Sequence, residues 1–551
     1  MDSIVILDGR SLSVQDILTV SKGKAKVDLS AEAKSKIASL REELEKMISD
    51  DPGLRIYGIN VGAGNLKDTP ISVKEAEKYQ IKYLLSHNCG TGKEVPLGIV
   101  RAMMVIRLNS FAAGKSGIKP DTCELMTDML NHGVTPVVRE EGSVGASGDL
   151  VPLSMIAAVL AGLDEAEAYY GGVKYDAKTA LKKAGLRPVA LGFKEAMGLT
   201  NGTNLMSGYM CSAAVDSEKI YILSNIAAAL SLEAIRGEKD AFSKELCSMR
   251  PHEGIIKTAE MMRKLIKGSQ RMSREAQQIA FKGQTPDTVQ TRVQDRYSFR
   301  AVPPVHGSLY EAVQEFNRVL SVEVNSVTDN PLFLHDDETG ELRAFSGSNF
   351  HGQPLASVID HLKSNLTAAG LISDKRSFSM LNKYLSFGLP SSLAYDPSKG
   401  DTGLMIAQYA GAARAADCRV LSTPASVTSI TTSAGQEDFV SMGSIGVLHL
   451  RKITENLKTI IAIEVLCAYR ALEMTNNNEY LPENLTELGK GTGKIFSYLA
   501  GKLHQYKGDY YVASDIEHLT ELLFSDEFFR FLSDELNIGL TVNKNVVENY
   551  L

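Results

Sequence analysis

The sequence predicts a mainly α-helical protein with a few short β-strands, and three observations lead to this fold class. Three long segments, 206–236, 306–327 and 447–474, carry apolar residues on more than one face, as helices do when they are buried in a bundle or between subunits. Shorter segments place apolar residues at helical spacing behind capping residues. Runs of strand-like composition are few, and the chain contains no internal repeat or low-complexity linker.

Capping residues mark the shorter helices. Ser30 can accept the free N–H groups at the start of a helix over 31–49, whose apolar residues recur at helical spacing. A second helix is expected over 72–85, where a serine is followed by two glutamates. A third covers 121–131, and Gly133 is placed to close it.

The expected strands are short. One covers 4–6 and a second lies within 168–174. Two more, 332–335 and 342–345, flank the polar turn 336–340, which favours a hairpin.

Helix content and charge divide the chain into three expected parts. Residues 1–205 form an N-terminal domain, 206–504 a central domain of long helices, and 505–551 an acidic C-terminal helical extension. The extension has nine acidic residues against three basic ones, so it carries −6 of the net charge of −7. The remainder is nearly balanced, which excludes the charge pattern of a nucleic-acid-binding protein and suits a protein that handles a small molecule.

Composition narrows the class of protein further. With 551 residues, 44% of them hydrophobic and 23% charged, the chain can bury a large core, and a disordered, collagen-like or disulfide-rich protein is excluded. The apolar run 150–163 is shorter than the roughly 20 residues of a membrane span. The first residues lack the basic and apolar regions of a secretory signal. We therefore expect a cytoplasmic protein that does not enter the membrane.

Cysteine and histidine spacing bears on redox state and metals. The six cysteines stand alone, without a Cys-x-x-Cys pair, and are expected to be small buried side chains in a reducing compartment. The sequence has neither a His-Glu-x-x-His motif nor paired Cys/His spacing, so no metal is expected.

Polar, glycine-rich stretches without helical periodicity separate the helices. Connections of this length in a compact chain are usually functional, and we expect them to converge on one site. They cover 57–65, 142–149, 200–204, 294–307, 346–353 and 423–443.

The stretch 142–149 carries the most distinctive chemistry. Its three glycines allow tight bends, including positive φ angles. Within it, Ala146-Ser147-Gly148 is a tripeptide that can cyclise if the Gly148 nitrogen is pressed onto the Ala146 carbonyl carbon. Loss of two waters then gives a methylidene-imidazolone, an electrophile that no ordinary side chain provides. Ser147 supplies the methylene, and Gly148 supplies an unhindered nitrogen.

All six stretches together resemble the motifs of one enzyme family. Gly-Ala-Ser-Gly-Asp-Leu at 145–150 resembles the signature of the aromatic amino-acid ammonia-lyases and aminomutases. The other stretches resemble further motifs of that family in the same order, over roughly residues 50 to 475. They are Tyr57–Gly64, Asn201–Thr203, Gln294–Arg300, Ser346–Gly352 and Gln436–Gly443.

The resemblance implies an architecture and a cofactor. The implied fold is a long-helix bundle of the ammonia-lyase and fumarase-like type. Family members form dihedral homotetramers in which each site is built from three chains, so 206–504 would form the tetramer core. The implied cofactor is 4-methylidene-imidazol-5-one formed autocatalytically from Ala146, Ser147 and Gly148, with no metal.

The resemblance also assigns residues to roles. Tyr57 would be the base, and its pKa would have to fall from about 10 toward the working pH. Arg300 and the positive ends of the helices near Asp149 and Asn201 would lower that pKa, and Arg300 would bind the substrate carboxylate through two parallel hydrogen bonds. Tyr297 is implied as a further catalytic residue, and Gln436 and Glu437 as hydrogen-bonding partners. The implied substrate-binding residues are Gly64, His87, Asn201, Gln294, Arg300, Phe350, Asp417, Gln436 and Glu437.

Substrate choice is expected to depend on Ser86-His87-Asn88. Ser-His resembles the histidine ammonia-lyases, which favours conversion of L-histidine to urocanate, although some tyrosine enzymes carry the same pair. Asp417 stands where histidine ammonia-lyases have a glutamate, one methylene longer. Further departures from the family pattern are Val61, Ala63, Thr423 and Gly435.

Several alternatives to a histidine ammonia-lyase, among them a modified substrate, remain open at this point. The chain could be a tyrosine ammonia-lyase or an aromatic 2,3-aminomutase, because lyase and mutase differ only in whether ammonia escapes or re-adds. A phenylalanine enzyme is least favoured, because such enzymes carry apolar residues at 86–87. An assembly protein that kept the fold and lost the chemistry is the alternative from a different class, and intact mass would distinguish it.

Overall fold

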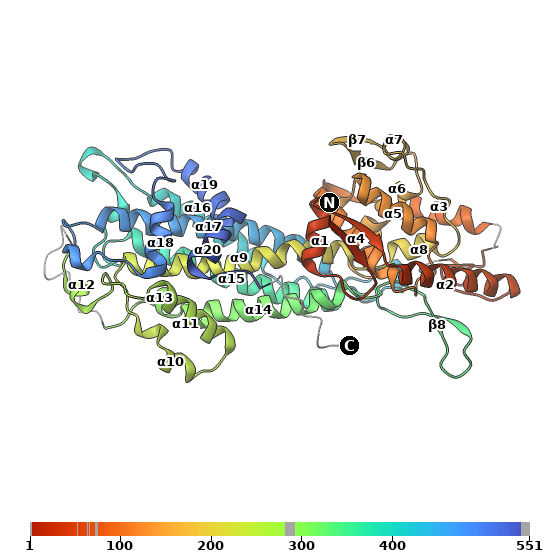
Figure 1. Cartoon of the computed structure of the whole chain (residues 1–551), viewed down its shortest axis with the longest axis horizontal. Coiled ribbons are helices and arrows are strands. Elements are labelled where there is room, and N and C mark those ends of the chain that lie inside the picture. Colours follow the sequence, from red (N-terminus) through yellow and green to blue (C-terminus); the bar gives the residue numbers. More distant parts are fainter. Residues whose placement is uncertain are drawn as a thin grey trace.

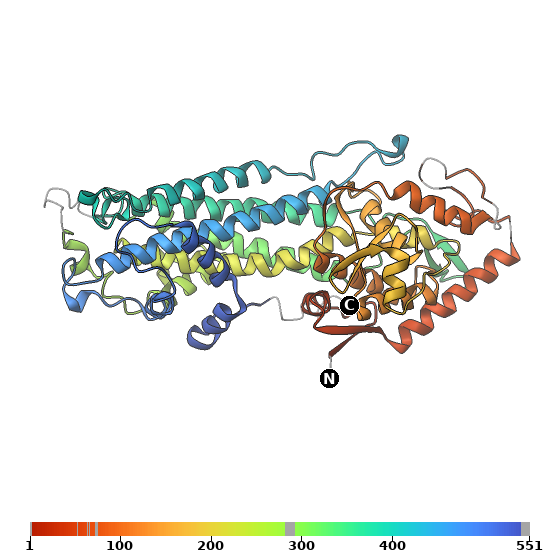
Figure 2. The same ribbon diagram turned by 90° about the horizontal axis from the view of Figure 1, so that it is seen from above.

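A computed structural model describes residues 3–51, 53–62, 64, 67–71, 75–281 and 293–541. The molecule is elongated, and the long helices run side by side along its long axis (Figures 1 and 2). Elements from the first 200 residues gather at one end (Figure 1). Because helices dominate and the strands are few and short, the predicted fold class is confirmed. In the described part of the chain, no helix is both long and apolar enough to cross a membrane.

Five helices form the long bundle. Among them α9 and α17 are buried on nearly every face, as their sequences predict. All three segments predicted as long helices are confirmed. The five are α9 (Asn204–Ala234), α14 (Val302–Glu323), α15 (Gln353–Leu381), α16 (Met405–Leu421) and α17 (Gly443–Thr475).

Helix α15 is not among the segments predicted to be long, because its buried face carries charged residues. Lys363 is fully buried and bonds Asp360, and Arg376 is fully buried and bonds Glu464 of α17. Buried charges are tolerated when they are paired in this way. The expected loop 294–307 is also partly wrong, since α14 begins at Val302 with prolines in its first turn, where a missing N–H costs nothing.

The shorter helices lie at the N-terminal end of the molecule and at or alongside the other half of the bundle, where α19 and α20 flank the long helices (Figure 1). At the N-terminal end they are α1 (Val14–Ser21), α2 (Ala31–Asp50), α3 (Ala76–His87), α4 (Leu97–Ala112), α5 (Pro120–His132), α6 (Leu150–Leu160), α7 (Ala177–Lys183) and α8 (Glu195–Thr200). At the other end they are α10 (Lys244–Ser248), α11 (Glu253–Leu265), α12 (Arg274–Gln278), α13 (Tyr297–Arg300), α18 (Lys490–Leu499), α19 (Ala513–Phe524) and α20 (Asp526–Leu536). Short 3₁₀ turns are η3 (Asp240–Phe242), η5 (Ser391–Leu393), η6 (Pro397–Lys399), η7 (Ser433–Gly435) and η8 (Glu483–Leu485).

The predicted caps explain where these helices start and stop. The Ser30 hydroxyl accepts a hydrogen bond from the Ala33 N–H, and Gly133 closes α5 in the left-handed conformation. Both predictions are confirmed. The second expected helix is α3, which runs two residues further than predicted, while its expected start at Ser72 lies outside the described residues.

Four small sheets complete the fold. β1 (Ser3–Leu7) pairs in parallel with β2 (Ala25–Leu29), and β3 (Thr91–Glu94) pairs with β5 (Arg139–Glu141). The third sheet has the order β4-β6-β7, built from β4 (Thr135–Pro136), β6 (Glu167–Tyr170) and β7 (Val173–Asp176). β8 (Leu332–His335) and β9 (Leu342–Phe345) form the predicted hairpin, with His335 opposite Leu342. The strands β2 to β5 are missing from the prediction because each is short and pairs with a distant segment.

The C-terminal helices pack on their own chain. Helix α19 lies against α17, where the fully buried Arg470 donates hydrogen bonds to the Asp515 carboxylate and the His504 carbonyl. One cysteine prediction is wrong: five cysteines are buried, but Cys89 is exposed, because it lies on the turn after α3.

Candidate active site

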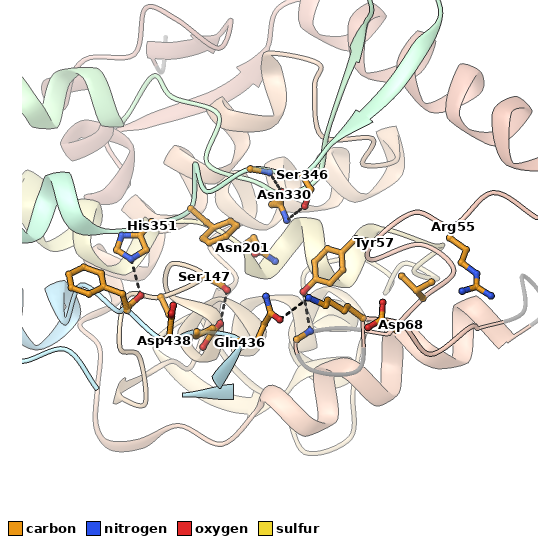
Figure 3. Close-up of a pocket in the computed structure, with 18 residues that line it drawn as sticks. Arg55, Tyr57, Asp68, Ser147, Asn201, Asn330, Ser346, His351, Gln436 and Asp438 are labelled. Atoms are coloured by element: carbon orange, nitrogen blue, oxygen red, sulfur yellow. Dashed lines mark hydrogen bonds between the residues drawn. The ribbon is translucent and has the colours of Figure 1, made fainter. Parts of the chain in front are cut away.

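A cavity of about 550 Å³ opens where the N-terminal elements meet the long helices (Figure 3). Five of the six glycine-rich stretches reach it, so their predicted convergence is confirmed for these five, and 294–307 does not take part. The lining residues are Arg55, Tyr57, Val61, Gly64, Lys67, Asp68, Ala146, Ser147, Asn201, Asn330, Ser346, Gly347, Phe350, His351, Gln436, Glu437, Asp438 and Phe439.

The loop 142–149 is held by the starts of two long helices. The Gly145 carbonyl accepts hydrogen bonds from the Gly352 N–H at the start of α15 and from the Ser441 hydroxyl just before α17. The Met442 N–H donates to the Val144 carbonyl at 2.9 Å. These bonds fix the loop backbone at the positive ends of both helices.

Asp149 ties the same loop to further helix starts. Its buried carboxylate accepts the N–H groups of Leu205 and Met206 in the first turn of α9, and the hydroxyls of Ser143 and Ser444. Burial raises the pKa of Asp149, although the four hydrogen bonds act in the opposite direction. Asp149 is itself the N-cap of α6, so four helices begin around this loop, and their N-termini favour negative charge there.

Gly148 is pressed against Gly202. Its φ is +72°, and a methyl group at this position would overlap the Gly202 carbonyl and come within 2.7 Å of the Gly202 nitrogen. The Gly202 carbonyl accepts the Asp149 N–H at 2.6 Å. Only glycine fits here. The tripeptide Ala146-Ser147-Gly148 is therefore held against the segment that carries Gly202.

Ser147 faces a carboxylate across the cavity. Its hydroxyl donates to Glu437 Oε1 at 2.8 Å (Figure 3). The other carboxylate oxygen, Oε2, accepts the Thr432 hydroxyl, also at 2.8 Å. Next to it, the Gln436 side-chain oxygen accepts a hydrogen bond from Lys67 at 3.0 Å. The loop that carries Glu437 thus contacts both the loop 142–149 and Lys67, which follows the stretch 57–65.

Tyr57 points into the same cavity, and its hydroxyl accepts the Gly64 N–H at 3.1 Å (Figure 3). Burial raises the pKa of Tyr57, the Gly64 N–H lowers it, and the negative charge of Glu437 raises it further. The expected lowering of this pKa by Arg300 is absent within one chain, because Arg300 lies elsewhere.

His87 ends α3 beside the site. Its Nδ1 lies 2.8 Å from the Tyr83 carbonyl oxygen. Its ring stacks on the Tyr83 ring, with 3.8 Å between the two ring centroids. A carbonyl only accepts, so Nδ1 carries the hydrogen and Nε2 of the neutral ring is an acceptor. Burial lowers the pKa of His87, although the charge of Glu437 opposes this shift, and the neutral form is therefore favoured.

His87 and Gly148 are not among the residues that line this cavity, and four more predicted residues lie away from it. Gln294 and Arg300 line a second cavity of about 410 Å³, and α13, which carries Arg300, lies at the opposite end of the bundle (Figure 1). Tyr297 is 72% exposed and lies under the Arg300 guanidinium. Asp417 on α16 is half-buried and accepts a hydrogen bond from Asn456. Of the four departures from the family pattern, Val61 lines the first cavity and Ala63 lies outside the described residues. The Thr423 carbonyl accepts a hydrogen bond from Lys363, and Gly435 ends η7.

Several lining residues have no role in the sequence-based site. His351 belongs to the stretch 346–353, and its ring is held by the Phe439 carbonyl at 3.2 Å. Asn330 accepts the Gly347 N–H and so fixes that stretch. Arg55 and Lys67 bring cations to the cavity, and nothing in the sequence distinguishes them from surface residues. In the described residues no group of three or more His, Cys, Asp or Glu side chains could hold a metal ion.

The family model for "Aromatic amino acid lyase" matches residues 12–499. The chain belongs to the aromatic amino acid lyase family. This lyase cleaves a carbon–nitrogen bond, which is the activity shared by its histidine ammonia-lyase relatives. The resemblance inferred from the six motifs is thereby confirmed.

The lyase is similar to enzymes that act on different rings. It is 37% identical to the histidine ammonia-lyase of Caldanaerobacter subterraneus subsp. tengcongensis, over 96% of this chain and 98% of that one. Its fold matches tyrosine aminomutase from Streptomyces globisporus with a TM-score of 0.86 and 31% identity, over 97% and 99% of the two chains. It matches histidine ammonia-lyase from Trypanosoma cruzi with a TM-score of 0.82 and 30% identity, over 96% and 95%.

Proposed function

We propose that this lyase eliminates ammonia from L-histidine to give trans-urocanate, using an electrophile cyclised from Ala146, Ser147 and Gly148. The observation that carries the proposal is the confinement of this tripeptide against Gly202 at the starts of four helices. When formed, the methylidene-imidazolone supplies an electrophile that binds the amine or the ring of the substrate.

The chain's own residues divide the remaining work. Tyr57 removes the β-hydrogen, and the helix N-termini around Asp149 stabilise negative charge that develops at the loop. Asn201 and Phe350 line the cavity beside Ser147 and position the substrate. The residue that would bind the carboxylate, Arg300, has the planar fork that suits this contact but lies at the far end of its own chain.

Assembly of several copies would bring Arg300 of one chain to the first cavity of another. We propose a homotetramer in which Arg300, Tyr297 and Gln294 of a neighbouring copy complete the cavity. Large apolar side chains are exposed along α16 and the loop that follows it, which supports burial of this face in an assembly. They include Ile406 (57% exposed), Tyr409 (60%), Val420 (73%), Val427 (77%) and Ile430 (61%).

His87 supports histidine as the substrate. With Nδ1 donating to the Tyr83 carbonyl, Nε2 accepts a hydrogen bond from a ring that presents a donor. The imidazole N–H of histidine meets this requirement, and a phenyl ring does not. The identity to histidine ammonia-lyases along nearly the whole chain points the same way.

A tyrosine ammonia-lyase or 2,3-aminomutase is the second candidate. A phenol O–H also donates to His87 Nε2, and the fold match to a tyrosine aminomutase is as extensive as that to a histidine ammonia-lyase. Hydrogen bonding to His87 Nε2 alone therefore does not separate the two substrates.

A substrate panel decides between them. The purified protein is incubated with L-histidine, L-tyrosine, L-phenylalanine and their β-isomers, and the conjugated acrylate products are followed by absorbance. We expect urocanate from histidine and no product from phenylalanine. Accumulation of β-amino acids would establish the aminomutase instead, and a chain with an intact serine and no product would be an assembly protein.

A further inference from the structure

The Ser147 hydroxyl must leave as water when the tripeptide matures, and the structure offers one titratable partner for it. Within the described residues, the hydrogen bond of Ser147 Oγ goes to Glu437 Oε1 at 2.8 Å. An alcohol oxygen is a poor leaving group unless it is protonated as it departs. A carboxyl group at hydrogen-bond distance from that oxygen is therefore the first requirement for dehydration.

The carboxylate of Asp149, which belongs to the same loop, already accepts hydrogen bonds on both oxygens. Asp149 is fully buried, and its two oxygens accept four hydrogen bonds from Ser143, Ser444, Leu205 and Met206. Its contacts hold the backbone, and none of them reaches Ser147. Glu437, in contrast, lines the cavity and uses Oε2 for Thr432 and Oε1 for Ser147.

Thr432 fixes the direction of Glu437. The Thr432 N–H donates to the Glu437 carbonyl, and the Glu437 N–H donates back to the Thr432 carbonyl, so the two residues form a closed backbone pair across η7. The side-chain bond between the same residues adds a third tie. These three hydrogen bonds fix the position of the Glu437 carboxylate beside Ser147, as a proton-transfer group requires.

We propose that Glu437 is the proton-transfer catalyst for the maturation of Ser147, a role that rests on the proposed cyclisation and is separate from turnover. Ring closure forms the bond between the Gly148 nitrogen and the Ala146 carbonyl carbon. The first water takes the Ala146 carbonyl oxygen and the hydrogens of the Gly148 and Ser147 nitrogens. The Glu437 carboxylate then accepts the Ser147 Cα proton, and the Cα electron pair forms the double bond to Cβ.

The same carboxyl group completes the second dehydration. As the Cβ–Oγ bond breaks, Glu437 returns the proton to Oγ, which leaves as the second water. Cα lies two bonds from Oγ, so one carboxyl group serves both transfers, and Glu437 ends as the carboxylate it began as. The net loss is two waters, with no oxidant or other co-reactant.

Intact mass of the purified, assembled protein tests the proposal. Wild type should be lighter than its sequence by two waters. Glu437→Gln keeps the shape of the side chain and one accepting oxygen but cannot transfer protons, so it should retain the Ser147 oxygen and be lighter by one water or none. Fully dehydrated Glu437→Gln would overturn the inference.

Matched variants separate this role from local charge and from folding. Asp438→Asn removes a neighbouring negative charge from the same cavity wall without touching Ser147, and it should lose both waters. Thr432→Val removes the side-chain hydrogen bond that orients Glu437. Measurements of intact mass over time after cell-free synthesis should therefore show dehydration slowed several-fold.

A folding defect is controlled by a second substitution. If Glu437→Gln fails to assemble, Glu437→Asp keeps the acid with a shorter reach and should mature more slowly than wild type. Maturation of Glu437→Asp and Thr432→Val at the wild-type rate would contradict the proposal.

The failure of this inference is distinct from failure of the proposed function. If wild type retains its full sequence mass, the cyclisation itself is wrong. If wild type and Glu437→Gln both lose two waters, cyclisation stands and only the role of Glu437 falls.

Discussion

The two cavities of this lyase hold different parts of the predicted site. The first holds Ser147, Tyr57 and Glu437, and it is built where four helices begin. The second, at the far end of the bundle, holds Arg300 and Gln294. The chemistry of the first lacks the expected carboxylate-binding arginine, and the second lacks the tripeptide.

This difference separates two physical problems. Cyclisation needs a confined backbone, which a single chain supplies through Gly148, Gly202 and the bonds to Asp149. Binding a zwitterion needs a cation near the base. Arg55 and Lys67 supply cations to the first cavity from the same chain, and the proposed assembly would add Arg300 from another copy. The following variants and measurements, from the largest expected effect to the smallest, test whether cyclisation depends on one chain and substrate binding on two.

Ser147→Ala should remove the electrophile while the chain still folds, because the hydroxyl has a single hydrogen bond to Glu437. Turnover should fall by more than the ~10²–10⁴-fold that loss of a general base costs. Steady-state rates and intact mass measure the effect. A variant with more than a tenth of wild-type turnover would show that Ser147 does not form the reactive group.

Mixed oligomers test whether the two cavities combine between chains. Tyr57→Phe and Arg300→Ala should each be nearly inactive alone. When they are co-expressed in equal amounts, about a quarter of the sites should contain both wild-type residues if these come from different chains. Activity near that fraction supports the shared site, and no recovery would place both residues in one chain's site.

Gly148→Ala should block maturation and destabilise the loop, because the methyl group overlaps the Gly202 carbonyl at a positive φ. We expect a loss of about 1–3 kcal/mol in the free energy of unfolding, measured by denaturant titration. Gly172→Ala is the control, since Gly172 has a similar φ of +79° but open space around it. Equal losses in both variants would show that the Gly202 contact contributes nothing.

The pH profile reports the charge around Tyr57. In the proposed mechanism the phenolate is the active base, so kcat/KM should rise with pH through the Tyr57 pKa. Burial and Glu437 raise that pKa, and a cation from a neighbouring copy would lower it. Arg300→Ala should therefore move the rising limb to higher pH. An unmoved limb would show that Arg300 lies too far from Tyr57 in the assembly.

Lys67→Met should have the smallest effect. Its ammonium group donates to Gln436 at an exposed site, where such a contact contributes about 1 kcal/mol or less. We expect kcat/KM to change by less than about tenfold, since 1.4 kcal/mol is one decade. A larger rise in KM alone would assign Lys67 to substrate carboxylate binding within the first cavity.

The sequence by itself determined the fold class, the buried faces of α9, α14 and α17, and the identity of the loop around Ser147. These features are local: a helix buried all round shows in its composition, and a glycine-rich tripeptide shows in its order. The buried charged residues of α15 and the strands that pair over long distances could not be predicted from the sequence, because their partners lie far away in the chain.

Only the tertiary structure decided which motifs meet. Five stretches reach one cavity, and the sixth, with Arg300, lies at the other end of the bundle. Motif order along the chain carries no information about this, because helices of about 30 residues separate their ends by some 45 Å. The hydrogen bond between Ser147 and Glu437, which are 290 positions apart, likewise depends on the packing of the helices that carry them.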